Sequence, residues 1–193
     1  MAKKIAIIIG HPDQESYCCA LAEAYKKGAH SSGAEIRCIE LGRLNFNPNL
    51  MYGYSKRMEL EEDLLAAQKA ISWADHLVFV YPTWWGTMPA LMKGFIDRTF
   101  LPDFAYQNVP GSPLPKKLLK GKTAHLLVTM DSPHWYYKWV AKQAGHHIMK
   151  RSILGFCGVA PVRITEFGPI KTSTAERRQQ WLDQTLQLGS KLA

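Results

Sequence analysis

The sequence predicts an α/β fold in which helices cover both faces of one parallel five-stranded sheet, a three-layer sandwich. Short, apolar runs rich in β-branched residues alternate along the chain with longer segments of helical periodicity. Two of these runs, residues 4–9 and 77–81, are apolar almost without interruption, as in parallel strands buried on both faces. With right-handed crossovers between the strands, we expect the order 2-1-3-4-5.

The first half of the chain supplies two strands and two helices. The strand at 4–9 leads through a loop to a helix from about Tyr17 to Ser31, for which Ser16 is the expected N-cap. Residues 35–41 alternate in polarity and predict an outer strand. A turn-rich segment then precedes a charged helix expected over 55–70.

The second half of the chain continues the alternation of strands and helices. Pro82 ends the third strand because proline cannot donate to a sheet ladder, and Pro89 suits the first turn of a helix over 90–100. A long proline-rich loop follows, and long loops inside a compact domain more often have a function than not. We then expect a strand at 123–130, a helix or helix pair over 139–156 with Gly145 as the candidate break, a strand within 159–167 and a helix over 174–191.

Length and composition indicate one domain spanning 1–193, without repeats or a linker. No apolar stretch approaches the ~20 residues of a membrane span. The N-terminal apolar run stops at Gly10 after five residues, too short for a secretory signal, so we expect a cytoplasmic protein. The four cysteines have no CxxC or metal-ligand spacing, which favours reduced packing residues and no metal site.

The formal net charge of +8 admits anionic partners. The basic residues are spread along the chain, so a solvated surface is the default interpretation, and attraction of a phosphorylated cofactor is the functional one. The sequence has no DNA or RNA motif and no long basic helix, so no nucleic-acid partner is expected.

The loop after the first strand is the usual anion site of such a fold, because backbone N–H groups at the next helix start face a ligand phosphate. This loop has neither G-x-G-x-x-G nor the Walker pattern, which argues against a Rossmann dinucleotide site and a nucleotide hydrolase. Ser16, Tyr17 and Cys18 can still offer backbone N–H groups, and His11 an imidazole N–H. Taken alone, His11 is more often structural.

The loop Thr83-Trp84-Trp85-Gly86 follows the third strand at the ligand-binding edge of the sheet. It could be simple packing, but two aromatic side chains there would form a flat wall suited to a planar ring such as a flavin. No Ser-His-Asp order or catalytic cysteine motif competes. His146 and His147 have no acidic residue nearby in the sequence and are interpreted as structural.

Three stretches together resemble the flavodoxin-like NAD(P)H:quinone oxidoreductase family, which includes drug-activity modulators and ancillary flavoproteins of potassium efflux systems. They are FVYPTWWGTMPALMKGFIDRTFLPDFAY, GHPDQESYCCAL and Asn45-Phe46-Asn47-Pro48. The similarity covers nearly the whole chain. It implies a flavodoxin-like sandwich, a bound flavin and NAD(P)H as electron donor.

The resemblance also implies roles for individual residues. The flavin phosphate or pyrophosphate would be held by His11, Ser16, Tyr17 and Cys18, and the isoalloxazine ring by Pro82, Thr83, Trp84 and Trp85. Phe104 and Tyr106 would form the substrate pocket across a homodimer interface, for which residues 95–106 are the candidate region. Tyr136 would act catalytically near the reactive edge of the flavin.

One short stretch and one single residue depart from the family pattern. Val128-Thr129-Met130-Asp131 stands where T-T-G-G is common, and Lys142 stands where a histidine usually follows the tyrosine by six residues. In the family that tyrosine–histidine pair steadies charge on the reduced flavin. Lys142 or His134 could supply a positive charge instead.

The function we expect is an oxidoreductase that passes two electrons, as hydride, from NAD(P)H to a quinone-like acceptor by a ping-pong mechanism. FAD is favoured over FMN because the chain length and the first loop resemble FAD-binding members more closely. The alternative is a flavodoxin-like carrier or a regulatory flavoprotein subunit with little turnover. Membrane association is expected only for the ancillary subunit of a transporter.

Overall fold

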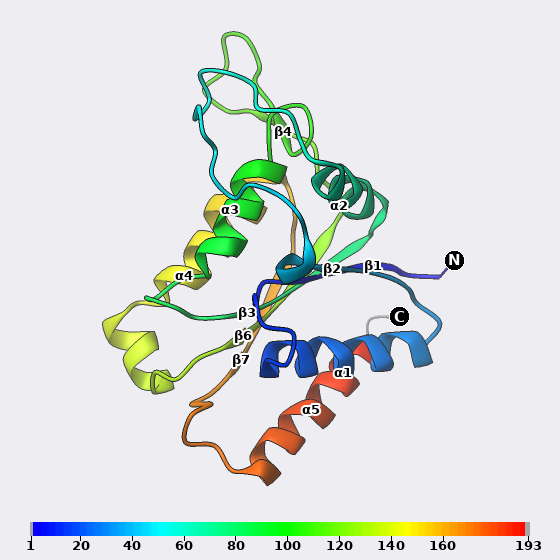
Figure 1. Cartoon of the computed structure of the whole chain (residues 1–193), viewed down its shortest axis with the longest axis vertical. Coiled ribbons are helices and arrows are strands. Elements are labelled where there is room, and N and C mark those ends of the chain that lie inside the picture. Colours follow the sequence, from blue (N-terminus) through cyan, green and yellow to red (C-terminus); the bar gives the residue numbers. More distant parts are fainter. Residues whose placement is uncertain (1, 192–193) are drawn as a thin grey trace.

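The computed structural model describes residues 2–191 and confirms the predicted fold (Figure 1). One sheet of five parallel strands has the order β2-β1-β3-β6-β7, which is 2-1-3-4-5 when only these strands are counted. The strands are β1 (Lys4–Ile9), β2 (Glu35–Glu40), β3 (His76–Pro82), β6 (Thr123–Thr129) and β7 (Val162–Phe167).

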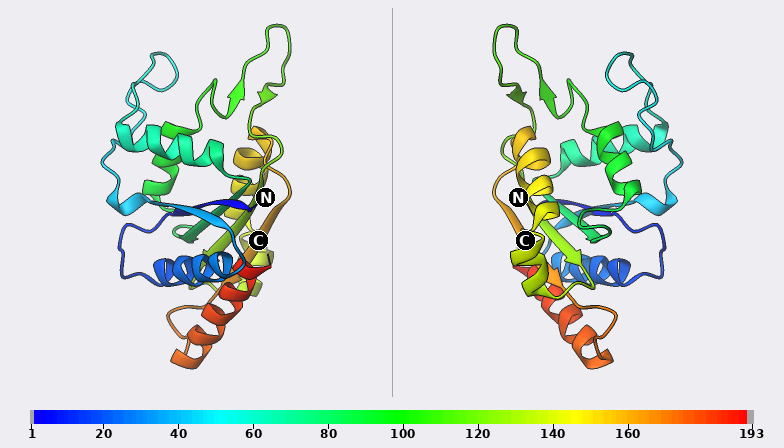
Figure 2. Two further views of the ribbon diagram at one scale, coloured as in Figure 1. Left: turned by 90° about the vertical axis from the view of Figure 1, so that its right-hand side faces the viewer. Right: turned by 90° about the vertical axis from the view of Figure 1, so that its left-hand side faces the viewer.

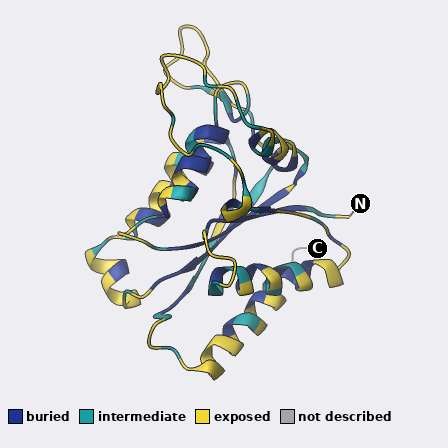
Figure 3. Ribbon diagram, viewed as in Figure 1, coloured by how far each residue is buried: buried dark blue, intermediate teal, exposed yellow. Residues whose placement is uncertain are grey.

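Helices cover both faces of this sheet, as Figures 1 and 2 show. One face carries α1 (Tyr17–Ser31) and α5 (Ala175–Ser190), and the opposite face carries α2 (Glu62–Trp73), α3 (Ala90–Thr99), α4 (Ala144–His147) and the π-helical η3 (Ile148–Gly155). Alternate β1 side chains enter two separate cores, Ile5, Ile7 and Ile9 on the α1 side and Ala6 and Ile8 on the other. The central strands β1, β3 and β6 are therefore buried on both faces, whereas the edge strands β2 and β7 are partly exposed (Figure 3).

The predicted start of α1 is confirmed. Ser16 has an extended backbone, and its side chain accepts a hydrogen bond from the Cys19 N–H, so it caps the helix. Thr174 caps α5 in the same way, by accepting from the Arg177 N–H.

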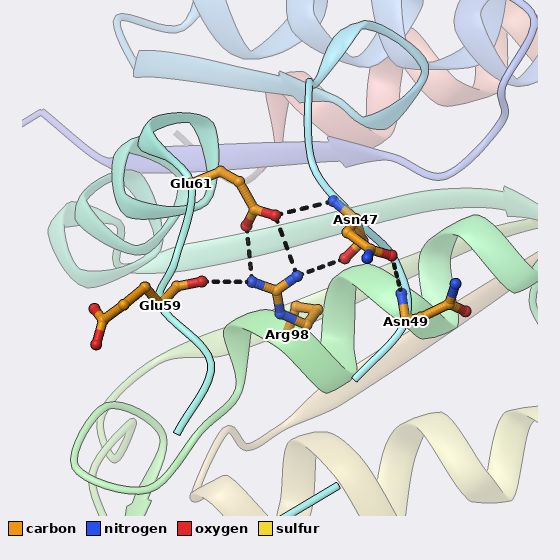
Figure 4. A network of polar contacts seen from close by, with 5 residues as sticks. All are labelled: Asn47, Asn49, Glu59, Glu61 and Arg98. Carbon is orange, nitrogen blue, oxygen red and sulfur yellow. Dashed lines mark hydrogen bonds and ion pairs between the residues drawn. The ribbon is translucent and has the colours of Figure 1, made fainter. Parts of the chain in front are cut away.

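The helix expected over 55–70 begins later, at Glu62, and extends to Trp73. Arg98 of α3 is the physical reason (Figure 4). Its guanidinium is fully buried and donates to the Glu59 carbonyl at 2.8 Å, the Glu61 carboxylate at 2.8 Å and the Asn47 carbonyl at 2.6 Å. These contacts hold residues 59–61 outside a helix, because a helical turn would direct the Glu59 carbonyl along its own axis.

The Asn45-Phe46-Asn47-Pro48 segment is structural in this fold. The Glu61 carboxylate accepts from the Asn47 N–H, the Phe46 ring packs edge-on against Phe95, and Pro48 lies directly on Gly94, where a side chain would clash. A short 3₁₀ turn, η1 (Leu41–Arg43), connects this segment to β2.

The long proline-rich loop contains a two-stranded hairpin of β4 (Tyr106–Gln107) and β5 (Lys116–Lys117), which projects from one end of the molecule (Figure 2). The helix expected over 139–156 is divided into the π-helical η2 (Tyr136–Val140), α4 and η3. The break lies at Lys142 and Gln143, both with φ of 50°, rather than at Gly145. Within residues 2–191, no helix combines the length and hydropathy needed to cross a membrane.

Candidate functional site

A cleft of about 300 Å³ opens at the carboxyl ends of β1, β3 and β6. The chain leaves β1 towards β2 on one side, and β3 lies on the other, so this is the switch point where ligands bind in open α/β sheets. The residues that line it are His11, Asp13, Ser16, Tyr17, Cys18, Pro82, Thr83, Trp84, Thr129, Met130, Asp131 and Ile170.

The N-terminus of α1 forms one side of the cleft. Among residues 2–191, no protein acceptor receives the backbone N–H of Tyr17 or Cys18. The first turn of this 15-residue helix has no acidic side chain. The free N–H groups and the positive end of the helix dipole therefore make this turn suitable for an anion.

His11 lies beside that turn. Its Nδ1 is 3.0 Å from the backbone nitrogen of Asp13 and 3.1 Å from the Asp13 carbonyl oxygen, so the loop backbone occupies Nδ1. When Nδ1 accepts from the Asp13 N–H, Nε2 carries the ring proton and can donate to a ligand. The imidazole also meets Trp84 edge-on, with ring centroids 5.4 Å apart. His11 and Trp84 therefore form one continuous wall.

The tryptophan loop is a tight turn. Trp84 and Thr87 exchange backbone hydrogen bonds, and the two residues between them have positive φ, 49° at Trp85 and 79° at Gly86. A positive φ is unfavourable for a residue as bulky as tryptophan. The turn directs Trp85 fully into solvent, outside the cleft, while Trp84 lines it. The expected flat wall of two tryptophans is therefore made by Trp84 alone.

The structure brings together seven of the eight residues expected to bind the cofactor: His11, Ser16, Tyr17, Cys18, Pro82, Thr83 and Trp84. Trp85 is the exception. Tyr17 contributes its backbone, because its hydroxyl donates to the Arg178 carbonyl at 2.7 Å and its ring packs near Trp181.

Cys18 does not provide a nucleophile. Its side chain is buried, and its sulfur lies 3.4 Å from the Thr129 hydroxyl. Burial raises the pKa of the thiol to about 12, so the reactive thiolate is scarce at neutral pH. Cys18 therefore acts as a packing residue below the anion site.

Sequence reasoning did not assign Asp13, Thr129 or Ile170 to the site. Thr129 ends β6 beside Pro82, and its carbonyl accepts from the Thr83 N–H at 2.7 Å. Ile170 reaches the cleft because its N–H donates to the Met130 carbonyl and the neighbouring Lys171 N–H donates to the Asp131 carboxylate. For Thr129, the signal available in the sequence was its place at a strand end.

Tyr136 does not line the cleft. It begins the π-helical turn η2, is about half exposed and contacts Trp135 edge-on. Its neighbour Tyr137 is the buried one, with its hydroxyl donating to the Gly86 carbonyl at 3.3 Å. Lys142, at the position of the family histidine, is exposed and also lies outside the cleft lining.

Phe104 and Tyr106 lie apart from the cleft. Phe104 contributes to a separate concavity of about 390 Å³ between residues 50–68 and 101–104, and Tyr106 packs edge-on against Phe156. The candidate interface at 95–106 is largely internal, because Phe95, Ile96 and Phe100 are buried in the protein's own core. Asp97 and the residues after Phe100 are the parts of this region that reach the surface, apart from the buried Ala105.

The interpretation of His146 as lacking an acidic partner was wrong. His146 Nε2 lies 2.7 Å from one oxygen of Glu166, and His134 Nδ1 lies 2.9 Å from the other. The partner is distant in sequence because it comes from β7, which pairs with β6 at the edge of the sheet.

Residues 3–188 match the model of a family described as having a flavodoxin-like fold. The chain belongs to this family. The resemblance seen in the sequence is thereby confirmed, together with the fold that it implied.

Two curated relatives carry names that describe an activity. An uncharacterised NAD(P)H oxidoreductase of Haemophilus influenzae is 28% identical over 182 residues, covering 92% of this chain and 89% of the relative. The ribosyldihydronicotinamide dehydrogenase [quinone] of Pongo abelii is 26% identical over 203 residues, covering 91% and 86%.

Solved structures share the fold over the whole chain. An NAD(P)H:quinone oxidoreductase from Methanothermobacter marburgensis has a TM-score of 0.81 at 23% identity, covering 100% of this chain and 98% of that one. An FMN-dependent NADH-azoreductase from Bacillus anthracis, described in complex with FMN, has a TM-score of 0.73 at 18% identity, with both chains fully covered. At these identities the two structures support the fold alone.

Proposed function

We propose that this protein is a flavin-dependent NAD(P)H oxidoreductase that reduces quinones or similar acceptors. One observation carries the proposal: a helix N-terminus with free N–H groups, an imidazole and an aromatic side chain converge in a single cleft at the switch point. The names of the two relatives support the same activity.

The residues present fit the phosphate of a flavin. The N–H groups of Tyr17 and Cys18 and the Nε2 of His11 would bind the phosphate oxygens. Two carboxylates, Asp13 and Asp131, also line the cleft, and their negative charges disfavour an anion there. Each accepts a backbone N–H, from Glu15 and Lys171 respectively, which ties it to the protein's own backbone.

Trp84, Pro82 and Thr83 would hold the ring system. Backbone N–H groups of this loop could stabilise negative charge on the ring, but those of Thr83 and Trp84 already donate to the Thr129 and Thr87 carbonyls. Among the described residues, the N–H groups of Trp85 and Gly86 have no protein acceptor, and these remain for that role. A bound flavin would supply the two-electron chemistry, taking a hydride from NAD(P)H and reducing the acceptor.

We propose FMN rather than the FAD favoured by the sequence. The cleft volume of about 300 Å³ is at the small end of ligand sites, which suits the smaller cofactor. A neighbour of the same fold is described with FMN bound. Heating the purified protein and separating the released flavin beside standards tests this proposal. Release of FAD alone would contradict it.

The acceptor and the kinetic order are tested together. In a ping-pong mechanism the oxidised nicotinamide leaves before the quinone enters the same pocket, so double-reciprocal plots at several quinone concentrations should be parallel. Intersecting lines would contradict this order. Turnover at background level with every acceptor tried would favour the alternative of a carrier or regulatory subunit.

We also propose a homodimer in which Phe104 and Tyr106 complete the partner's site, because neither lines the cleft of its own chain. The projecting end that carries them also exposes Met51, Tyr52, Tyr54, Val109 and Leu114, an apolar surface suited to an interface. Sedimentation analysis should find a dimer. Tyr106→Ala should change acceptor kinetics more than flavin retention, and the opposite result would argue against this placement.

A further inference from the structure

Glu166 is the centre of a polar cluster at the β7 edge of the sheet. One carboxylate oxygen contacts His146 Nε2 at 2.7 Å and the Gln143 side-chain amide at 3.2 Å, and the other contacts His134 Nδ1 at 2.9 Å. Glu166 belongs to β7, whereas the three other residues belong to the segment 133–147. The cluster therefore joins one strand to both ends of that segment.

The other face of the same segment touches the wall of the cleft. The His146 ring packs edge-on against Tyr137 with centroids 5.0 Å apart, and the Tyr137 hydroxyl donates to the Gly86 carbonyl at 3.3 Å. Gly145 lies so close to this turn that a side-chain carbon there would meet the Gly86 carbonyl oxygen at 2.6 Å. A continuous series of contacts thus runs from Glu166 to the turn that carries Trp84.

The contacts at Glu166 are strong because they involve charge. The hydrogen bond from His146 holds the pKa of the Glu166 carboxyl at about 2 despite partial burial, so the carboxylate is ionised at neutral pH. His134 faces acceptors from both ring nitrogens, Glu166 from Nδ1 and the Gly168 carbonyl from Nε2 at 2.9 Å. Both contacts are hydrogen bonds only when the ring carries two protons.

We propose that Glu166 is a positioning residue, which holds the segment 133–147 against the Trp84–Thr87 turn and thereby sets the geometry in which the nicotinamide and the acceptor react. This inference rests on the proposed function and deepens it. The segment also carries Tyr136, expected from the resemblance to lie near the reactive edge of the flavin. Glu166 acts through these neighbours and does not itself line the cleft.

The structure separates this role from binding of the flavin phosphate. The residues proposed to hold the phosphate belong to the β1–α1 loop and the first turn of α1, and none of these described residues makes a hydrogen bond or ion pair with Glu166 or its two histidines. Loss of the Glu166 charge should therefore disturb the reaction while leaving flavin affinity largely intact, because the phosphate contacts are unchanged.

The test compares Glu166→Gln with wild type and with Glu40→Gln. Glu40 ends the opposite edge strand, β2, and within residues 2–191 it forms an ion pair with Arg43 alone, so its substitution is a matched loss of one carboxylate. Trypsin reports on the segment directly, because Lys138 and Lys142 lie within it and are exposed. Cleavage there is compared with cleavage at Lys26 and Lys27 of α1, which reports on global unfolding.

In Glu166→Gln, we expect cleavage after Lys138 and Lys142 to be about tenfold faster, since charge-assisted hydrogen bonds are lost. Cleavage in α1 should be unchanged. We expect kcat to fall about ten- to hundredfold from misplacement of reacting groups, with the flavin Kd within about twofold of wild type. Glu40→Gln should match wild type, and His134→Gln, which removes one arm of the cluster, should give smaller changes in the same direction.

Wild-type cleavage rates and kcat in Glu166→Gln would overturn the proposal. So would parallel increases in cleavage at α1 and in flavin loss, because these would indicate a role in overall stability only. If wild type itself fails to bind flavin or oxidise NAD(P)H, the proposed function fails. The ratio of cleavage in the segment to cleavage in α1 then still decides whether Glu166 holds the segment.

Discussion

Ser16→Asp separates the structural role of the α1 N-terminus from its proposed role in flavin binding. Aspartate caps a helix as well as serine does, and its charge is favourable at the positive end of the helix dipole. The carboxylate would accept the Cys19 N–H, as the Ser16 hydroxyl now does at 3.4 Å. The thermal stability of the flavin-free protein should therefore stay within about 2 °C of wild type.

Flavin binding should respond in the opposite direction. Ser16 lines the cleft beside the free N–H groups of Tyr17 and Cys18, so the new carboxylate would lie next to the phosphate. Two unit charges about 4 Å apart repel by ~1 kcal/mol in water and by ~4 kcal/mol at an effective dielectric constant near 20. The half-buried Ser16 lies between these limits. We expect the flavin Kd to rise from about tenfold to several hundredfold.

Titration of the flavin-free protein with FMN, followed by flavin fluorescence, measures this change. Ser16→Thr is the control, because threonine keeps a neutral cap, and its Kd should stay within about threefold of wild type. Added salt should reduce the effect of the aspartate, since exposed charges are screened. Wild-type affinity in Ser16→Asp would refute the placement of the phosphate at α1.

Three further predictions concern the cleft wall and the buried charges. Trp84→Leu should weaken flavin binding about two- to tenfold through loss of an aromatic contact, whereas Trp85→Leu should not. Equal effects of the two substitutions in a fluorescence titration would contradict a cleft wall made by Trp84 alone. Glu61→Ala should lower the free energy of unfolding in urea by about 3–5 kcal/mol, because the buried Arg98 loses its counter-ion. A loss below about 1 kcal/mol would show that Arg98 is satisfied by its carbonyl partners alone. The His146 hydrogen bond holds the pKa of Glu166 at about 2, below its ordinary value of 4.5, so its stabilisation is complete above 4.5 and is lost as pH falls towards 2. Wild type should therefore lose more unfolding free energy than Glu166→Gln between about pH 5 and pH 2, and parallel curves would contradict that.

The sequence predicted the parts of the site that depend on local sequence patterns. Continuous apolar runs identified β1 and β3, and Ser16 placed the start of α1, because burial on both faces and N-capping leave local signatures. Strand ends meet at one edge of a parallel sheet, which is why the His11 loop and Trp84 line one cleft.

The features that the sequence did not predict depend on backbone detail or distant partners. Trp85 leaves the cleft because it and Gly86 both adopt positive φ, and only Gly86 offers a local signal of that turn. The start of α2 is set by Arg98, which comes from the following helix. His146 meets Glu166 only because β7 pairs with β6, a contact that no spacing between the two residues reveals.

Anaerobic addition of NADPH or NADH to the flavin-loaded protein tests whether it is a flavin-dependent NAD(P)H oxidoreductase. We expect at least one of the two nicotinamides to bleach the visible flavin absorbance, and the absorbance to return when a quinone is added. A spectrum unchanged by both nicotinamides would contradict it.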